Sequence, residues 1–296
     1  MVIVRLIGGL GNQMFQYAAG RSLALRHGVA LKLDISGFAD YPLRRYSLGC
    51  FNIVEEFASP EEIARVKSPP RRRLVRLIRR AWRKVAGPPP YYRQPVFQES
   101  MLRPFDPNIW RTPRDVYLDG YWQSEKYFKD IEHIIRSEFT FRPEQDLQSR
   151  DIAAMIAETN SVSIHVRRGD YVSNPLTNRV HGVCGLDYYA ACVRFMADRV
   201  GKPHFFVFSD EPEWAAENLR FAYPMTFVTH NRDGREYEDL RLMSLCRHHI
   251  IANSSFSWWG AWLNARAGKI VLAPQRWFNE PDRDTSDLVP DGWIRV

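Results

Sequence analysis

The stretch that decides the fold is SIHVRRGDYV, which runs from Ser163 to Val172. At its start apolar residues alternate with polar ones, as in a β-strand, and the polar side ends in His165, Arg167 and Arg168. A Gly-Asp turn follows at once. Two adjacent guanidinium groups at the end of a buried strand repel each other unless an anion lies beside them.

The pattern that continues from this stretch is regular. From residue 161 onward, predicted strands at residues 161–166, 204–209, 225–229, 248–252 and 269–273 alternate with predicted helices at 187–200, 212–219, 237–246 and 256–266. Continuous apolar strands that alternate with helices indicate a parallel sheet covered on both faces. In such a sheet the ligand binds beyond the carboxyl ends of the strands.

The N-terminal half begins with strand, loop, helix and strand at residues 2–7, 8–13, 14–26 and 30–34. Residues 40–115 are less regular, and residues 124–139 have the spacing of a helix. A chain of 296 residues is long enough for two domains. We therefore predict an α/β fold of two Rossmann-like domains with parallel sheets, residues 1–150 and residues 151–296.

The net charge of +7 comes from one segment of the chain. Residues 67–84 carry nine Lys or Arg and no acid, so subtracting these nine charges leaves −2 for the rest. This distribution argues against a nucleic-acid partner, which a broad basic surface would bind, and for a local basic patch.

The cysteines and the N-terminus bear on the cellular compartment. The spacing of Cys50, Cys184, Cys192 and Cys246 fits neither a metal site nor a disulfide framework, so we expect reduced thiols. Met1 opens directly onto a strand, which predicts no signal peptide. No run approaches the roughly 18 apolar residues of a membrane span. We therefore expect a cytoplasmic protein.

A second anion-binding feature is predicted on the same sheet edge as Arg167 and Arg168. The stretch from Asn253 to Ser255 leaves one strand and enters a helix, where amides, hydroxyls and the positive end of the helix dipole converge. Arginine suits phosphate oxygens bidentately. Two such sites on one edge indicate a diphosphate. The alternative gives the arginines to ion pairs with Asp170 or Asp210 and the serines to helix capping.

Three further acids lie where a nucleoside would need them. Asp210 and Glu211 end another strand and could hold a ribose, and Asp239 precedes an apolar helix face. A carboxylate binds guanine well because guanine presents two adjacent N–H donors. The alternative is that these acids only begin their helices.

The N-terminal loop supports a rival hypothesis, an NAD(P)-dependent oxidoreductase. Gly9 and Gly11 follow a strand as in a dinucleotide fingerprint, and Asp34 ends the second strand, where a ribose-binding acid would lie. Met14 occupies the position of the third glycine, which normally permits close packing of helix and sheet. A binding module is a third class, because RRGD contains an RGD triplet, but here the triplet closes an apolar strand.

Four motifs carry a family resemblance. HVRRGDY, GGLGNQMFQYAAG, FSDEPEW and NSSFSWWGAWL closely resemble the motifs of the bacterial α1,2-fucosyltransferases, which are related to the α1,6- and protein O-fucosyltransferases. The match runs from Arg5 to about Pro274, in the family's order. It implies a GT-B-like architecture of two facing Rossmann-like domains, with the acceptor side in residues 1–150 and the donor held by residues 151–296.

The resemblance also implies the reaction. L-Fucose would pass from GDP-β-L-fucose, a co-substrate, to the 2-hydroxyl of a terminal β-galactoside with inversion, forming an α1,2 linkage without a metal or other cofactor. The D-x-D at residues 282–284 lies away from any predicted strand end, in agreement. Lactose, N-acetyllactosamine and O-antigen galactosides stay open as acceptors, and the oligomeric state is not predicted.

The motif positions acquire roles from the same resemblance. Arg167 would bind the β-phosphate and stabilise the charge on departing GDP, while Arg168 and Asp170 would order that loop and His165 would lie against the nucleoside. Asn12 resembles the loop that approaches the anomeric centre. The predicted catalytic residues are thus Arg167, Asn12 and Asp170, and the predicted donor-binding residues are His165, Arg167, Arg168, Asp210, Asp239, Asn253, Ser254, Ser255, Phe256, Gly9 and Gly11.

No general base emerges from the sequence. Inversion needs a group that takes the acceptor proton. The α1,6 relatives place a glutamate shortly after Arg-Arg-x-Asp, whereas residues 171–178 here contain no acid. Asn12 would orient the hydroxyl without removing its proton, which leaves late transfer to the departing phosphate. Asp34 and Asp170 are weaker candidates that we interpret as structural.

The basic segment reads as one amphipathic helix at residues 71–86, bracketed by prolines. Leu74, Leu77, Ile78 and Trp82 recur on one face, and arginines fill the other. A basic amphipathic helix with Trp is typical of a peripheral contact with an anionic membrane, here the cytoplasmic face of the inner membrane, where lipid-linked acceptors lie. The alternative is a helix docked on its own domain with a solvated basic face.

Overall fold

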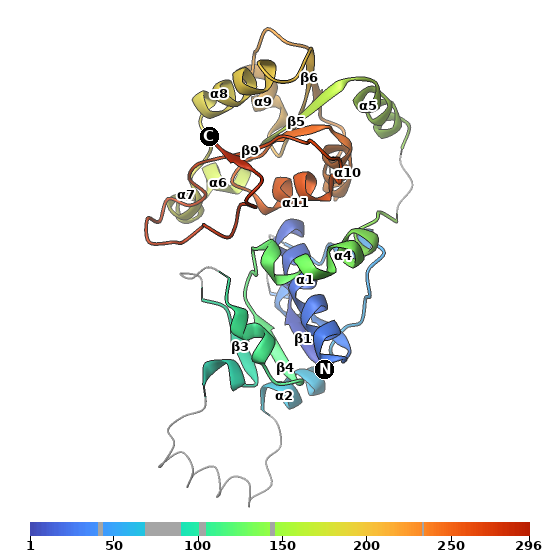
Figure 1. Ribbon diagram of the computed structural model, residues 1–296, viewed down its shortest axis with the longest axis vertical. Helices are drawn as coiled ribbons and strands as arrows, with labels where there is room; N and C mark the ends of the chain where they lie inside the picture. The colour runs from blue at the N-terminus through green and yellow to red at the C-terminus, as the bar shows by residue number, and fades with distance from the viewer. Residues whose placement is uncertain (41–43, 69–89, 101–104, 143–145, 233) are drawn as a thin grey trace, which may run out of the picture. The chain divides into compact units, whose positions relative to one another are not determined.

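The chain forms two compact units, Met1–Thr140 and Phe141–Val296 (Figure 1). The computed structural model describes residues 1–40, 44–68, 90–100, 105–142, 146–232 and 234–296. The predicted border at residue 150 falls inside a helix of the second unit, α5 (Leu147–Glu158). The predicted basic helix at residues 71–86 lies outside the described residues.

The first unit is built on a parallel sheet with the strand order β2-β1-β4-β3. Its strands are β1 (Val2–Arg5), β2 (Leu31–Asp34), β3 (Val96–Gln98) and β4 (Val116–Asp119). Its α-helices are α1 (Leu10–His27), α2 (Pro60–Lys67) and α4 (Glu132–Glu138). Short 3-10 turns lie at Ser36–Phe38, Leu48–Cys50, Tyr91–Arg93, Pro107–Arg111, Glu125–Tyr127 and Lys129–Ile131.

Helix α1 begins at Leu10, earlier than the predicted Met14, because the extended Gly9 already serves as its N-cap. It ends where Gly28 adopts the left-handed conformation and donates its N–H to the carbonyls of the last turn. Gly11 and Asn12 therefore lie in the first turn of a helix and not in a loop.

The single helix predicted over residues 124–139 is wrong in its first half. Residues 125–131 form two 3-10 turns, and only Glu132–Glu138 is α-helical. Tyr127 and Phe128 are adjacent, and both are fully buried, so they cannot share one face of a helix. Phe128, with φ −144° and ψ 8°, lies between the two turns and is not helical. This break lets both rings enter the core.

The second unit has a six-stranded parallel sheet with the order β10-β9-β8-β5-β6-β7. Its strands are β5 (Asn160–Val166), β6 (Pro203–Ser209), β7 (Met225–Val228), β8 (His248–Ile250), β9 (Val271–Ala273) and β10 (Ile294–Arg295). Besides α5, its helices are α6 (Gly169–Ser173), α7 (Pro175–His181), α8 (Leu186–Ala197), α9 (Pro212–Asn218), α10 (Glu236–Leu245) and α11 (Ser255–Leu263).

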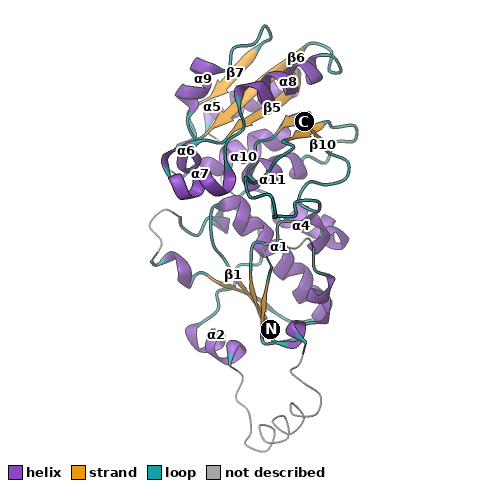
Figure 2. Ribbon diagram, turned by 90° about the vertical axis from the view of Figure 1, so that its left-hand side faces the viewer, coloured by secondary structure: helices purple, strands orange, loops and turns teal. Residues whose placement is uncertain are grey.

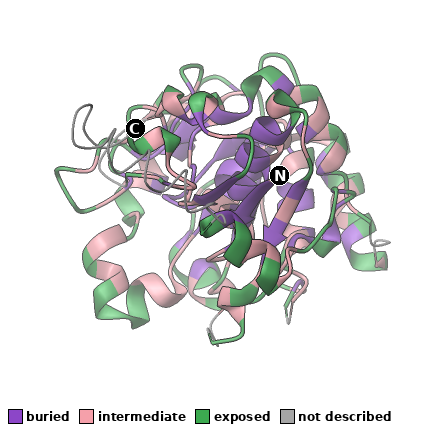
Figure 3. Cartoon of the chain, turned by 90° about the horizontal axis from the view of Figure 1, so that it is seen from below, coloured by how far each residue is buried: buried purple, intermediate pink, exposed green. Residues whose placement is uncertain are grey.

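Helices enclose the central strands of this unit (Figure 2). Across the described chain, buried residues gather on strands and on the helices beside them (Figure 3). Strand β5 is buried from Ser161 to Val166, as its apolar pattern predicts. Trp258, Trp259 and Trp262 of α11 are also buried, so these aromatic residues belong to the core. The predicted α/β class with a parallel sheet in each half is confirmed.

Candidate functional site

The strand order of the second unit locates its ligand-binding edge. From β5 the chain runs through β6 to β7 on one side and then returns to β8 on the other side of β5. Such a reversal is a topological switch point, and open α/β sheets bind ligands in the crevice that it creates. The loops that follow β5 and β8 are residues 167–168 and 251–254, and they contain most of the two predicted anion-binding features.

Arg167 is held by two carboxylates at this edge. Its Nη1 lies 2.9 Å from Asp210 Oδ2, and its Nη2 donates to Asp170. Burial lowers the pKa of Arg167, but Asp210 and Asp170 outweigh this effect and raise it. Only 20% of the side chain is exposed. Both ion pairs are predicted by the alternative that gives Arg167 to Asp170 or Asp210. They hold a charged guanidinium at the switch point.

The side chain of Arg168 has other partners than that of Arg167. Its Nε donates to Glu211 Oε2 at 2.9 Å, and its guanidinium lies 3.6 Å from the centre of the Trp214 ring. Its backbone N–H donates to Asp210 Oδ1 at 2.9 Å. Arg168 therefore orders the loop, whereas Arg167 is the arginine placed at the crevice.

His165 is a buried polar side chain that lacks a partner. It is 5% exposed, and within the described part of the chain its Nδ1 has no hydrogen-bond partner. Its ring lies 5.6 Å from that of Phe256 in the first turn of α11. Burial, assisted by the charge of Arg167, lowers the pKa of His165 to about 3, so the imidazole is neutral. A neutral ring beside a helix N-terminus is free to bond a ligand.

In the loop after β8, Ser254 caps a helix and Asn253 holds neighbouring loops together through hydrogen bonds. Ser254 is the N-cap of α11, and its Oγ accepts the N–H of Phe256 at 3.3 Å. The first amides of a helix have no partner within the helix, so the first turn of α11 offers N–H groups to an anion, apart from that of Phe256, which Ser254 caps. The Asn253 side chain is committed elsewhere, because its Nδ2 donates to His181 O at 2.8 Å and to Trp277 O at 3.3 Å.

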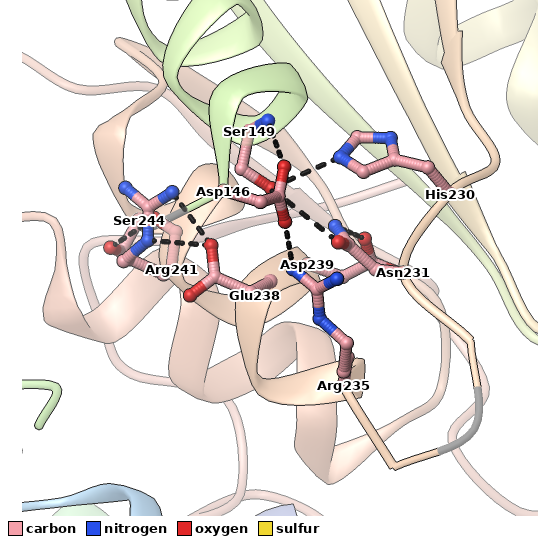
Figure 4. A network of polar contacts seen from close by, with 9 residues as sticks. All are labelled: Asp146, Ser149, His230, Asn231, Arg235, Glu238, Asp239, Arg241 and Ser244. Atoms are coloured by element: carbon pink, nitrogen blue, oxygen red, sulfur yellow. Dashed lines mark hydrogen bonds and ion pairs between the residues drawn. The ribbon is translucent and has the colours of Figure 1, made fainter. Parts of the chain in front are cut away.

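Asp239 lies in a polar network that joins α10 to the start of α5 (Figure 4). Its Oδ1 accepts from Asn231 Nδ2 at 2.8 Å. Ser149 Oγ lies 3.0 Å from His230 Nε2, and the Asp146 carboxylate accepts from Arg235. Burial, reinforced by the nearby Glu236 and Glu238, raises the pKa of Asp239 to about 7. Asp239 therefore carries a carboxyl that a ligand with N–H donors would help to ionise.

The remaining predicted residues belong to the first unit. Asn12 Oδ1 accepts from Gln123 Nε2 at 2.8 Å, and Gly9 and Gly11 lie at the start of α1. Asp34 is buried, and its two oxygens accept from Ser36 N at 2.9 Å and from Tyr117 Oη at 2.6 Å. Since both oxygens are engaged inside the unit, Asp34 is a structural residue, neither a base nor a ribose ligand.

Several polar residues at the two sheet edges escape sequence reasoning. In the second unit, Asn231 orients Asp239, and the Tyr171 ring stacks on His181 at 4.6 Å. In the first unit, Glu99 and Gln123 lie beside Asn12 or the loop that follows β4. Apart from Tyr171, which ends the motif HVRRGDY, none of them lies in a motif of known chemistry. The signal that could have found Gln123 is its place just after a strand, as for Arg167.

Two negative findings apply to the described residues alone. They contain no group of three or more His, Cys, Asp or Glu side chains arranged to hold a metal ion. The helices among them are all too short or too polar to cross a bilayer. None of the four cysteines forms a disulfide within the described ranges.

Comparison with known proteins gives a consistent family. Residues 102–296 match the model of glycosyl transferase family 11. The chain is 34% identical over its whole length to an α-1,2-colitosyltransferase of Escherichia coli, covering 99% of it, and 34% identical over 98% of its length to the O-antigen biosynthesis glycosyltransferase WbnK of Escherichia coli, also covering 99%. It is 30% identical over 60% of its length to galactoside α-(1,2)-fucosyltransferase 1 of Rattus norvegicus, spanning half of that protein.

Two solved structures are also similar. The fucosyltransferase NodZ from Bradyrhizobium shares 15% sequence identity with a TM-score of 0.47, over 88% of this chain and 92% of that chain. POFUT1 in complex with GDP shares 12% identity with a TM-score of 0.45, over 91% and 98% of the two chains.

Proposed function

The chain belongs to glycosyl transferase family 11, and from this membership we propose that it transfers L-fucose from GDP-β-L-fucose to the 2-hydroxyl of a terminal β-galactoside. The transfer inverts the anomeric centre and forms an α1,2 linkage. The observation that carries the proposal is the meeting of three features at the switch point between β5 and β8: Arg167, the N-terminus of α11, and His165, whose Nδ1 has no partner among the described residues. Neither the structure nor the relatives favour the oxidoreductase alternative.

In this proposal the diphosphate lies between Arg167 and the first turn of α11. The guanidinium binds the β-phosphate, and uncapped amides in the first turn of α11 bind the neighbouring oxygens. As the bond between the sugar and the phosphate breaks, negative charge grows on the departing GDP, and Arg167 stabilises it. Asp170 and Asp210 hold the guanidinium in position before the donor arrives. These groups offset the charge without a metal ion.

The acceptor proton goes to the departing GDP. When the acceptor oxygen forms its bond to the anomeric carbon, the bond from that carbon to the phosphate oxygen breaks on the opposite face of the sugar, and the hydroxyl proton reaches a β-phosphate oxygen through water. Asp34 is engaged by Ser36 and Tyr117, and Asp170 by Arg167. Asn12 orients the hydroxyl, since a side-chain amide does not take up a proton at neutral pH.

Asp239 reads guanine in this proposal, and its protonation makes donor affinity depend on pH. The base donates two N–H groups, which favour the charged carboxylate. Because the pKa of the free site is about 7, binding below that pH must expel a proton. We expect the affinity for GDP-fucose to rise about tenfold per pH unit up to about pH 7 and then to level off.

Calorimetric titration with GDP-fucose between pH 5 and 8.5 checks this expectation. Asp239→Asn should bind weakly and show a flat profile, and an equally steep rise in that variant would assign the proton to another group. The same shift has the opposite effect on folding. Between about pH 4 and 7 the folded state binds this proton more tightly than the unfolded chain, so the free energy of unfolding falls as pH rises.

The identity of the donor sugar is tested by comparing two sugar nucleotides in separate reactions. The name of the full-length Escherichia coli relative favours a second candidate, colitose, which is L-fucose without its 3-hydroxyl. The chain should be incubated with GDP-fucose or GDP-colitose, with a panel of β-galactosides and with EDTA, and the product linkage determined. An α1,2-fucosyl product is expected. A colitosyl product alone would replace the donor, and no product with no donor hydrolysis would reject the proposal.

We also propose that the protein lies on the cytoplasmic face of the membrane through residues 71–86. Each basic residue near an anionic surface contributes about 1 kcal/mol of binding. Replacing Arg72, Arg76, Arg79 and Arg83 by Gln should therefore lower binding to phosphatidylglycerol vesicles by roughly a hundredfold or more. Co-sedimentation measures this effect, with phosphatidylcholine vesicles as the control. Unchanged binding to the vesicles would show that residues 71–86 do not attach the protein to the membrane.

A further inference from the structure

The first unit has its own switch point, and polar side chains meet there. The strand order β2-β1-β4-β3 means that the chain leaves β1 toward β2 on one side, while β4 lies on the other side of β1. Asn12 lies in the first turn of α1, the helix that follows β1, and Gln123 lies in the loop that follows β4, and the two side chains are hydrogen-bonded at 2.8 Å. A ligand of this unit is expected in that crevice.

The bond between Asn12 and Gln123 leaves one hydrogen-bonding end of each amide available. Gln123 uses its Nε2 as donor and Asn12 uses its Oδ1 as acceptor, so this bond does not engage the Asn12 NH₂ or the Gln123 Oε1. Both side chains are half-buried, and Gln123 Oε1 has no partner in the described ranges. Sugar hydroxyls both donate and accept, so the Asn12 NH₂ suits the hydroxyl that reacts and the Gln123 Oε1 suits another hydroxyl of the same sugar.

The loop that carries Gln123 is held in an unfavourable conformation. Trp122 has a φ of 57°, in the left-handed region that residues other than Gly rarely adopt. Glu99 Oε2 holds this turn by accepting the N–H groups of Tyr121 at 2.6 Å and of Trp122 at 2.8 Å. The Trp122 ring is fully buried and stacks on Phe97 at 5.8 Å.

A glycine on each side of this site packs closely against a neighbouring side chain. A methyl group at Gly120 would collide with Glu99, and Gln16 Nε2 donates to Gly120 O at 3.2 Å. On the Asn12 side, Gly8 has a φ of 76°, and a Cβ there would lie 2.6 Å from Asn12 Nδ2. Strain that many contacts maintain is characteristic of functional sites.

From these observations we infer that Gln123, paired with Asn12, binds the acceptor galactoside through a hydroxyl other than the one that reacts. This inference rests on the proposed function and adds a residue that selects the acceptor. Glu99 is a positioning residue, because it holds the Trp122 turn that places Gln123 beside Asn12.

The kinetic test is a double-mutant cycle between Gln123→Ala and acceptors that lack the 3-, 4- or 6-hydroxyl. We expect Gln123→Ala to raise the KM for the galactoside about tenfold and to leave the KM for GDP-fucose and the slow hydrolysis of GDP-fucose unchanged. One deoxy acceptor should be equally poor for the wild type and the variant. Equal penalties in both proteins for every deoxy acceptor would overturn the inference.

Two variants separate this role from a structural one. Gln123→Glu keeps the size of the side chain but cannot donate to Asn12 Oδ1, so it should lose acceptor affinity like Gln123→Ala. Gln148→Ala removes an exposed glutamine of α5 in the other unit and should behave as the wild type. A parallel loss of donor hydrolysis or melting temperature in the Gln123 variants would indicate a structural role and reject the assignment.

A binding experiment keeps the inference independent of catalysis. Saturation-transfer NMR with methyl β-D-galactoside and GDP detects acceptor binding even if no sugar is transferred. The wild type and Gln148→Ala should give the signal, and Gln123→Ala should lose it. A wild type that transfers no fucose but still shows this pattern would reject the proposed function alone. Equal signals in all three proteins, or no signal in the wild type, would reject the inference.

Discussion

Replacing Arg167 by alanine is expected to lower kcat for sugar transfer by about 10³-fold, because it removes the group that stabilises the charge on departing GDP. Arg167→Lys should recover little of the loss, since an ammonium group cannot bond two phosphate oxygens in one plane. Steady-state kinetics with saturating GDP-fucose and galactoside measure both variants.

The control for Arg167→Ala is an arginine of the same unit outside the switch point. Arg199 lies at the end of α8 with its guanidinium 3.6 Å from the Phe195 ring, and it precedes β6, far in sequence from the loops after β5 and β8. Arg199→Ala should retain full activity. Arg167→Ala must also keep a cooperative melting transition, so that lost activity reports the site. Retained transfer in that variant would move the phosphate-binding role to other residues.

Replacing Gly169 by alanine is expected to lower kcat/KM for GDP-fucose by about a hundredfold, although glycine has no side chain to contribute. A methyl group there would collide with Asp210 Oδ2. Asp210 would have to move, and with it the 2.9 Å contact to Arg167 Nη1 and the 2.9 Å bond from the Arg168 N–H. The guanidinium would then be misplaced relative to the phosphate.

Gly201 is the matched control for this substitution. No atom lies within 4 Å of the position that a Cβ would take there, so Gly201→Ala should leave both activity and melting temperature unchanged. The variant Asp210→Asn completes the comparison, since it keeps the shape of the side chain and removes its charge. If Gly169→Ala were as active as the wild type, the position of Asp210 would not matter for donor binding.

The sequence predicts the second unit well because its signals are local. Buried parallel strands are continuously apolar, and β5, β6 and β8 coincide with the predicted segments. The adjacency of β5 and β8, whose facing residues Val162 and His248 are far apart in sequence, follows only from the strand order. That order is what brings the two predicted anion features together.

The first unit is harder to predict because its signals are short. Strands β3 and β4 have three and four residues, which is too few for a periodic pattern to stand out. The roles of Asn253 and Gln123 depend on partners distant in sequence, Trp277 and Asn12, which no local pattern reveals. Side-chain bonding therefore separates the motif residues that hold the loops from those available to a ligand.

A crystal structure of the protein with GDP bound is the most direct test of the central claim. We expect the β-phosphate to lie within hydrogen-bonding distance of the Arg167 guanidinium and of amides in the first turn of α11. GDP bound elsewhere, with Arg167 still paired only to Asp170 and Asp210, would contradict it.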